Sequence, residues 1–156
     1  MSSFLPPETE QGYAPPSVRQ FSVFLDNKVG KLNELLRLFE EKEQLHLAGF
    51  SVIDASDYAV VRVIFSNADL ARSLLRQAGY TFSESDLLVV ELHESQTLKN
   101  LCMHLLGAEL NIRFAYPVML QREGCPTVAL SVDDHTLAGQ ILLRKRYSLL
   151  GEEDLA

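Results

Sequence analysis

The sequence predicts an α+β protein in which one small unit, with the element order strand, helix, strand, strand, helix, strand, occurs twice. Along the chain, short segments with alternating apolar side chains are followed by longer segments whose apolar residues recur at helical spacing. The pattern is found in both halves of the chain, since Leu98 lies 66 residues after Leu32 and Asn111 lies 65 residues after His46. The length of 156 residues fits two such units.

The first repeat contains four predicted strands and two predicted helices. Its strands are rich in β-branched and aromatic residues, and apolar side chains occupy every second position of the opening strand. Each helix carries an apolar stripe, and Gly79 is placed to cap the end of the second one. The predicted elements are strands at 19–25, 45–53 and 58–65, a fourth strand that starts with residues 80–82, and helices at 31–44 and 70–78.

The second repeat shows the same order of elements. Its strands are predicted at 87–92, 111–120, 127–132 and 148–150, its helices at 97–109 and 136–146, and a hairpin turn at 121–124. The apolar stripe of the first of these helices consists of residues that we expect to face inward: Leu98, Leu101, Cys102, Leu105 and Leu106.

This order of elements is that of the ferredoxin-like fold, an antiparallel sheet with helices on one face. We therefore expect two ferredoxin-like units in tandem, over residues 18–84 and 85–156. Residues 1–17 contain two Pro-Pro pairs and no apolar run, and we expect them to form a flexible tail.

The composition argues against several classes of function. The formal net charge is −7 and the longest basic cluster is Arg144-Lys145-Arg146, so nucleic-acid binding is not expected. No segment approaches the roughly 18 apolar residues of a membrane span, and the opening residues lack a signal-peptide pattern, so we expect no membrane association and a cytoplasmic location. The two cysteines and four histidines show no metal-ligand spacing, so we expect reduced thiols, no metal and no cofactor.

A polar turn between the first strand and the first helix is the strongest candidate for a binding site. The strand leads directly into the helix, whose first backbone N–H groups lack partners within the helix and favour a small anion such as a carboxylate. Gly30 lets a ligand approach the backbone, and Asp26 or Asn27 can accept a hydrogen bond from an ammonium group. These features together describe a site for an α-amino acid. An ordinary turn could have the same residues, with Asn27 as a cap and Lys28 and Lys31 in solvent.

The residues around this turn resemble the ACT domain, a small regulatory module that binds amino acids or related effectors. The residues that carry the resemblance are Leu25, Asn27, Gly30, Leu32, Leu38, Phe39, His46, Ser51, Val52, Asp57 and Arg62. The second repeat looks like another copy, with Asn111-Ile112 at the start of its second strand, and the likeness covers about residues 19–152. The tandem is similar to small stand-alone proteins with two ACT domains.

The resemblance implies a ligand site at the first strand–helix turn, completed by the second strand of a neighbouring ACT unit. It also implies a homodimer and a role in regulating a metabolic enzyme. With Asp26 included for its local chemistry, the predicted ligand-binding residues are Asp26, Asn27, Lys28, Val29, Gly30, Lys31, Leu32, His46 and Asn111.

The second repeat departs from the family pattern at the corresponding turn. Gln96 stands where the first repeat has Gly30, and His93 stands where it has Asn27. A side chain at position 96 narrows the space above the helix end, and Glu94 adds negative charge where a carboxylate would bind. We therefore expect no second equivalent site.

No pattern in the sequence indicates catalysis, and we do not expect an enzyme. The chain has no glycine-rich phosphate loop and no zinc motif, and the cluster Asp133-Asp134-His135 precedes a helix that it is expected to cap. A second interpretation remains open, because the first repeat also resembles the ACT module of the acetolactate synthase small subunit. The protein would then bind a partner enzyme without a ligand of its own, and it should expose a large apolar patch.

Overall fold

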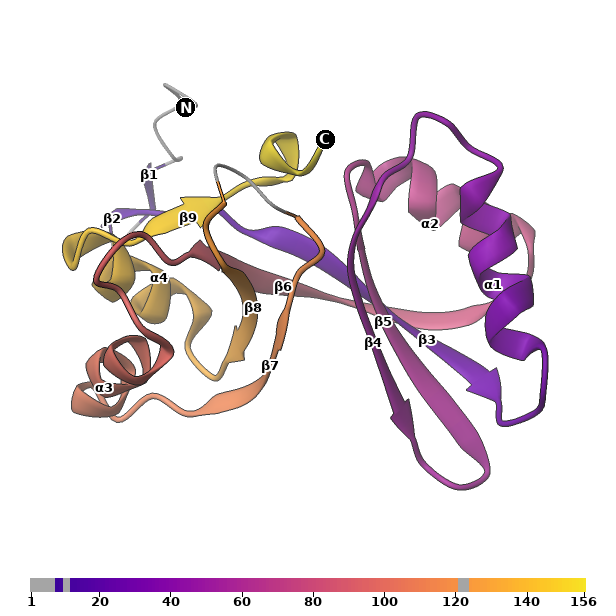
Figure 1. The fold of residues 1–156 in the computed structure, drawn as a ribbon, viewed down its shortest axis with the longest axis horizontal. Coiled ribbons are helices and arrows are strands. Elements are labelled where there is room, and N and C mark those ends of the chain that lie inside the picture. The colour runs from indigo at the N-terminus through magenta and orange to yellow at the C-terminus, as the bar shows by residue number, and fades with distance from the viewer. Residues whose placement is uncertain (1–7, 10–11, 121–123) are drawn as a thin grey trace. The chain divides into compact units, whose positions relative to one another are not determined.

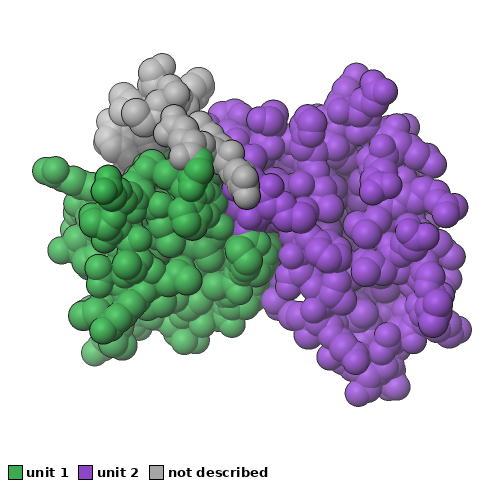
Figure 2. Space-filling model, viewed as in Figure 1, with its two compact units in different colours: residues 1–18, 87–117, 121–151 green, residues 19–86, 118–120, 152–156 purple. Residues whose placement is uncertain are grey.

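The computed structural model describes residues 8–9, 12–120 and 124–156 (Figure 1). The chain divides into two compact units (Figure 2). Unit 2 consists of residues 19–86, 118–120 and 152–156, and unit 1 consists of residues 1–18, 87–117 and 121–151. The first sequence repeat therefore forms most of unit 2, and the second repeat forms most of unit 1.

Unit 2 has the element order that the sequence predicts for the first repeat. Its elements are β3 Val18–Asp26 from Arg19 onward, α1 Lys31–Glu40, β4 Leu47–Asp54, β5 Tyr58–Phe65, α2 Ala68–Gln77, the part of β6 Thr81–Glu91 up to Asp86, and the 3₁₀ helix η1 Glu152–Leu155. The strand order is β4-β5-β3-β6, and β5 runs antiparallel to both β3 and β4. The helices α1 and α2 cover one face of this sheet (Figure 1).

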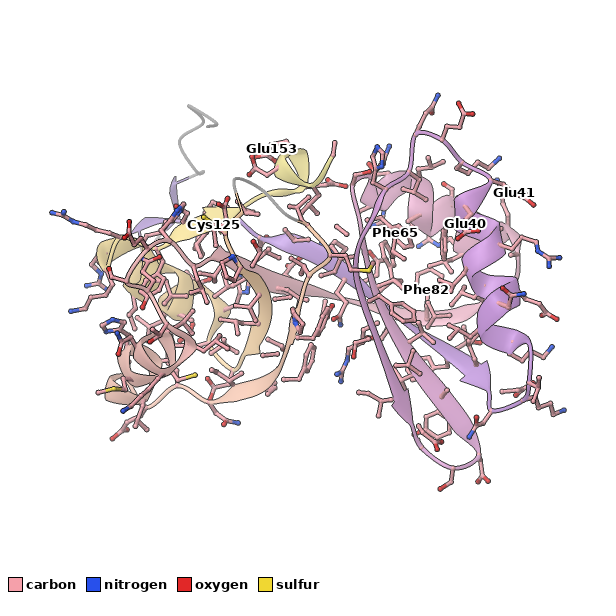
Figure 3. All side chains as sticks on the ribbon, in the orientation of Figure 1. Glu40, Glu41, Phe65, Phe82, Cys125 and Glu153 are labelled. Carbon is pink, nitrogen blue, oxygen red and sulfur yellow. The ribbon has the colours of Figure 1, made fainter. Side chains whose placement is uncertain are left out.

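The core of unit 2 lies between this face and the two helices. Phe21, Val23 and Leu25 are buried at alternate positions of β3, so the residues between them lie on the opposite face of the sheet. The ring centroids of Phe39 in α1 and Phe65 in β5 are 4.3 Å apart. Phe65 belongs to this core and the partly buried Phe82 packs against it, and both are labelled in Figure 3.

Unit 1 repeats the same plan. Its elements are β1 Glu8–Thr9, β2 Gly12–Tyr13, the part of β6 from Leu87 onward, α3 Leu98–Gly107, β7 Ile112–Pro117, β8 Thr127–Val132, α4 His135–Arg144 and β9 Ser148–Leu150. The strand order is β9-β6-β8-β7, and each pair is antiparallel. The predicted fold class is therefore confirmed in both units.

The core of unit 1 is built from α3, α4 and one face of its sheet. Leu88 and Val90 of β6 are buried in it together with Leu101 and Leu105 of α3. The expectation that the whole apolar stripe of α3 faces inward is wrong, because Leu98 and Leu106 are 52% and 73% exposed and Cys102 is also exposed. The stripe is wider than the surface that the sheet offers to this helix.

Several predicted elements have different bounds in the structure, and the strand predicted at 111–120 ends at Pro117. The segments 80–82 and 87–92 belong to one strand, β6, because the residues between them contain no glycine or proline to break an extended backbone. The first helix ends at Glu40 and not near residue 44. Glu40 and Glu41 place negative charge at the negative end of the helix dipole, which disfavours further turns (Figure 3). Of the predicted hairpin turn at 121–124, residues 121–123 lie outside the described residues.

The segment predicted to form a flexible tail includes a packed residue. Pro15 is buried, and a Cβ atom added to Gly139 of α4 would lie 2.4 Å from the Cβ and Cγ atoms of Pro15. The proline ring therefore lies directly against this glycine. Residues 1–7 and 10–11 of the segment lie outside the described residues. Among the described residues, no helix has the length and apolar character needed to cross a membrane.

Candidate functional site

The turn before α1 leaves open space above the start of the helix. The strand β3 ends at Asp26, and the helix begins at Lys31. Gly30 is the N-cap residue, and its φ of +89° lies in the left-handed region that favours glycine. A Cβ atom at this position would meet no heavy atom within 4 Å. Apart from the two chain neighbours of Gly30, no described residue therefore places an atom where a side chain at this position would begin.

The first turn of α1 keeps backbone N–H groups without protein partners. Among the residues that the structure describes, the amides of Leu32 and Asn33 have no hydrogen-bond acceptor, and no side chain caps the helix. The three other α-helices of the described chain are capped by Asn67, Thr97 and Asp134, whose side chains accept from backbone N–H groups. The start of α1 thus has the unsatisfied donors and the partial positive charge that bind a small anion.

Asn27 connects this turn to the hairpin between β4 and β5. Its Nδ2 atom donates to Oδ1 of Asp54 at 2.8 Å and to the carbonyl oxygen of Ser56 at 3.0 Å. The same Oδ1 atom of Asp54 accepts from the Ser56 N–H at 3.0 Å. The amide nitrogen of Asn27 is therefore used within the fold. Its Oδ1 atom has no hydrogen-bond donor among the described residues and can serve as an acceptor for a ligand.

Charged side chains of both signs surround the turn. Asp26 and Lys28 are exposed, and the Nζ atom of Lys31 lies 3.6 Å from Oε2 of Glu34. Val29 is fully exposed at the tip of the turn. A zwitterion would find acceptors at the strand end and donors at the helix end of the same short segment.

The corresponding turn in unit 1 is occupied by a side chain of the turn itself. Oε1 of Gln96 accepts from the His93 N–H at 2.8 Å, and Nε2 of Gln96 donates to the carbonyl oxygen of Arg146 at 3.2 Å. The Thr97 hydroxyl accepts from the Asn100 N–H at 3.1 Å and caps α3. The side chains of Gln96 and Thr97 thus hold backbone groups at this helix start, and the absence of a second equivalent site stays a prediction.

The other two residues predicted for the site lie away from the turn. His46 precedes β4, where its N–H donates to Oγ of Ser66 at 3.0 Å and its carbonyl oxygen accepts from the Ser66 N–H at 3.0 Å. Since β4 runs from Leu47 to Asp54, His46 and the turn lie at opposite ends of this strand. Asn111 belongs to unit 1, where its N–H donates to Oδ1 of Asp133 at 3.1 Å. That either residue contributes from a neighbouring unit stays a prediction.

The acidic cluster at the start of α4 has the capping role that the sequence predicts. The Oδ1 atom of Asp134 accepts from the Leu137 N–H at 3.1 Å, and Oδ1 of Asp133 accepts from the Asp134 N–H at 3.0 Å. These hydrogen bonds satisfy backbone donors at the helix start.

Solved structures of other proteins have a similar fold. BT0572 of Bacteroides thetaiotaomicron superposes with a TM-score of 0.80 at 21% sequence identity, over 90% of this chain and 96% of that chain. The regulatory subunit of aspartate kinase from Thermus thermophilus, in a ligand-free form, superposes with a TM-score of 0.55 at 9% identity, over 83% and 91% of the two chains. At these sequence identities, both structural similarities show a shared fold and nothing more. Among curated proteins, none matches this sequence.

The family assignment rests on the sequence itself. The model of the family described as ACT domain pair matches residues 16–156, which include both units almost completely. The resemblance inferred from the turn at Asn27 and Gly30 and from the repeated element order is thereby confirmed. The chain belongs to the ACT domain pair family.

Proposed function

We propose that this protein is a non-catalytic, cytoplasmic regulator that senses a free amino acid, or a similar small carboxylate, at the turn Asn27–Leu32 of unit 2. Its membership of the ACT domain pair family supports a regulatory, amino-acid-sensing role. The observation that carries the choice of this turn is the uncapped start of α1 beside Gly30, where a Cβ position has no heavy atom within 4 Å.

The chemistry of the turn matches both ends of an α-amino acid. The ligand carboxylate would accept hydrogen bonds from the amides of Leu32 and Asn33 at the positive end of α1, with Lys28 adding positive charge nearby. The ligand ammonium group would donate to the Asp26 carboxylate and to Oδ1 of Asn27. A simple anion would contact only the groups that bind the carboxylate, so we expect a zwitterion to bind more tightly.

A second copy of the chain is part of this proposal. The turn lies at the surface, and Val29 at its tip is fully exposed, whereas sites for small molecules usually bury most of the ligand. We propose that an ACT unit of a second copy covers the ligand and supplies a strand start such as that at His46 or Asn111. The side chain of the amino acid would then contact the second copy, which would set the specificity.

A thermal-shift screen of the twenty amino acids tests the proposal. A ligand that binds only the folded protein raises its stability by RT ln(1 + [L]/Kd), which is about 2.7 kcal/mol at a concentration of 100 Kd. We expect one amino acid, or a few of similar shape, to raise the melting temperature at millimolar concentration, while inorganic anions do not. A screen in which no amino acid has an effect would reject the sensing function.

An exposed apolar patch on unit 2 favours a second candidate function, the binding of a partner enzyme. Phe24, Ile53 and Tyr58 are 40%, 38% and 47% exposed. Phe24 pairs with Val60, which pairs with Ile53, and the rings of Phe24 and Tyr58 are 6.4 Å apart, so the patch is continuous. It lies on the sheet face opposite the helices, where another protein would bury it.

Light scattering shows whether this patch joins two copies of the chain or binds a different protein. If it joins two copies, the wild type is a dimer and Phe24→Lys is a monomer, whereas Val52→Lys, on the other face of β4, leaves the dimer intact. If the patch instead binds a regulated metabolic enzyme, both variants keep the oligomeric state of the wild type. Only Phe24→Lys then loses the enzyme in a pull-down experiment.

A further inference from the structure

A polar cluster occupies the sheet of unit 1 on the face away from its helices. Glu91, at the end of β6, is only 6% exposed. It pairs with Thr127 of β8 on one side and with Ser148 of β9 on the other. Leu88 and Val90 face the core, so alternation along the strand places Glu91 on the opposite face. Cys125, which lies just before β8 and is labelled in Figure 3, completes the cluster with His93.

The two ring nitrogens of His93 have different neighbours. Nδ1 lies 3.5 Å from the Sγ atom of Cys125. Nε2 lies 2.9 Å from the Oγ atom of Ser148 and 3.8 Å from Oε2 of Glu91. The imidazole therefore stands between a thiol on one side and a hydroxyl with a buried carboxylate on the other.

This arrangement favours one tautomer of His93. With the proton on Nε2, the ring donates to Ser148 and faces the Glu91 carboxylate, while Nδ1 accepts the Cys125 S–H. A proton taken from the thiol would give an imidazolium ion next to Glu91, which would stabilise its positive charge. Ser148 cannot use the same base, because the nitrogen that it contacts carries the proton in this tautomer.

A metal ion fits the cluster less well. One ligand atom from each of Glu91, His93 and Cys125 lies within 4.8 Å of the others. However, Cys125 and Glu91 lie beside different nitrogens of the ring, and the lone pairs of these nitrogens diverge. A single ion on the lone pair of one nitrogen would be less well placed for the ligand that lies beside the other nitrogen.

We propose that Cys125 is a reactive thiol that is activated by His93 and forms mixed disulfides with small disulfide compounds. The Sγ atom attacks one sulfur of the disulfide as its proton moves to Nδ1 of His93. A new S–S bond forms on Cys125, the original S–S bond breaks, and the leaving thiolate takes the proton from the imidazolium. The His93 side chain is 40% exposed, which gives a small disulfide access to the pair. This modification site does not depend on the proposed function of unit 2.

Cys102 provides an internal control. It is exposed on α3, and no contact in the described part of the chain joins it to an imidazole. Exposure alone would make Cys102 the faster thiol, whereas activation by His93 makes Cys125 faster even though it is partly buried.

The test uses the neutral aromatic disulfide dithiodipyridine at neutral pH with the full chain. Cys102→Ser leaves Cys125 as the reacting thiol, and Cys125→Ser leaves Cys102. We expect Cys125 to react at least about tenfold faster than Cys102. Adding His93→Gln should slow Cys125 by about the same factor without changing Cys102. Ser148→Ala, which removes only a contact to Nε2, should slow Cys125 less, and it serves as the test if His93→Gln does not fold.

Three results would overturn the proposal. Cys102 could react as fast as Cys125, or Cys125 could keep its rate in a folded His93→Gln protein. The purified protein could also contain stoichiometric zinc and show an unreactive Cys125 until a chelator is added, which would assign the cluster to a metal ion.

Discussion

The Nδ2 atom of Asn27 lies 2.8 Å from Oδ1 of Asp54, and this hydrogen bond joins the turn before α1 to the hairpin between β4 and β5. A second bond from Nδ2 reaches the carbonyl oxygen of Ser56 at 3.0 Å. One side chain thereby fixes both the shape of the turn and the position of its own Oδ1 atom. The residue that the sequence marks as a ligand acceptor is also a structural link between two loops.

Replacing Asn27 should therefore affect ligand binding more than stability. Asn27→Ala removes two exposed hydrogen bonds, so we expect the free energy of unfolding to fall by at most about 1 kcal/mol in urea titrations. The amino-acid response in the thermal-shift assay should fall sharply, because the acceptor is lost and the turn is loosened. Asn100→Ala, at an exposed position on α3 of unit 1, is the control and should keep the response. An Asn27→Ala protein with an undiminished response would remove this residue from the site.

A bulky residue at position 30 should block the ligand without unfolding the protein. Gly30→Val places a branched side chain above the amides of Leu32 and Asn33, at a φ of +89° that costs about 1–2 kcal/mol for such a residue. Gly79→Val is a matched control, since Gly79 has a φ of +79° and equally open surroundings at the end of α2. Both variants should lose similar stability, and only Gly30→Val should lose the amino-acid response. Equal responses in the two variants would move the site elsewhere.

The ion pair between α2 and β6 should make unit 2 sensitive to acid. Nε of Arg72 lies 2.9 Å from Oε2 of Glu84, and an Arg72 Nη atom lies 2.6 Å from Oε1. The hydrogen bonds from Arg72 hold the pKa of Glu84 below its usual value, against an opposing effect of burial. A carboxyl with a lowered folded-state pKa stabilises the fold above its unfolded-state pKa of about 4.3, and this stabilisation is lost as the pH falls through the folded-state value.

Glu84→Gln tests this contribution. At pH 7 we expect the variant to be less stable than the wild type by about 1–2 kcal/mol, because a charge-assisted pair is replaced by a neutral one. The difference should shrink as the pH falls below about 4. Chemical unfolding at a series of pH values measures it, and a difference that stays constant down to the acid limit would show that the charge on Glu84 has no role.

Because Pro15 lies against Gly139, a glycine-to-alanine substitution should destabilise the protein in α4 but stabilise it in α3. Gly139→Ala would bring a Cβ atom to 2.4 Å from the proline ring, so the segment around Pro15 or α4 must shift and we expect a loss of about 1–3 kcal/mol. Gly107→Ala, in α3, meets no atom within 4 Å and should stabilise the helix by about 0.5 kcal/mol. Thermal unfolding of both variants checks this, and a neutral Gly139→Ala would mean that the contact does not persist in solution.

The order and type of the main elements followed from local patterns. The strand Tyr58–Phe65 has the bounds that its β-branched residues predict, and Asn67 and Gly79 mark the two ends of α2 as capping residues should. The continuous strand β6 was missed because short polar segments in extended conformation look like loops. Contacts such as that of Glu84 with Arg72, which hold such a segment in place, are tertiary.

The candidate site was predictable only in part. Gly30 and the start of α1 could be located because a strand, a turn and a helix follow each other in the sequence. Asp54 and Ser56 could not be assigned to the site, since their contact with Asn27 depends on how a distant hairpin aligns with the turn. The same holds for Cys125 and His93, which are 32 residues apart and form no spacing motif.

The most direct test of the central claim is a titration of the ¹⁵N-labelled protein with the amino acid found in the screen, followed through its backbone amide resonances. The amides of Gly30, Lys31, Leu32 and Asn33 should shift with a common binding curve, because the ligand carboxylate accepts hydrogen bonds at the start of α1. The amides of the corresponding turn, from Gln96 to Lys99, should not shift, because Gln96 and Thr97 occupy that helix start. Shifts at the second turn without shifts at the first, or binding that leaves both turns unchanged, would contradict the account.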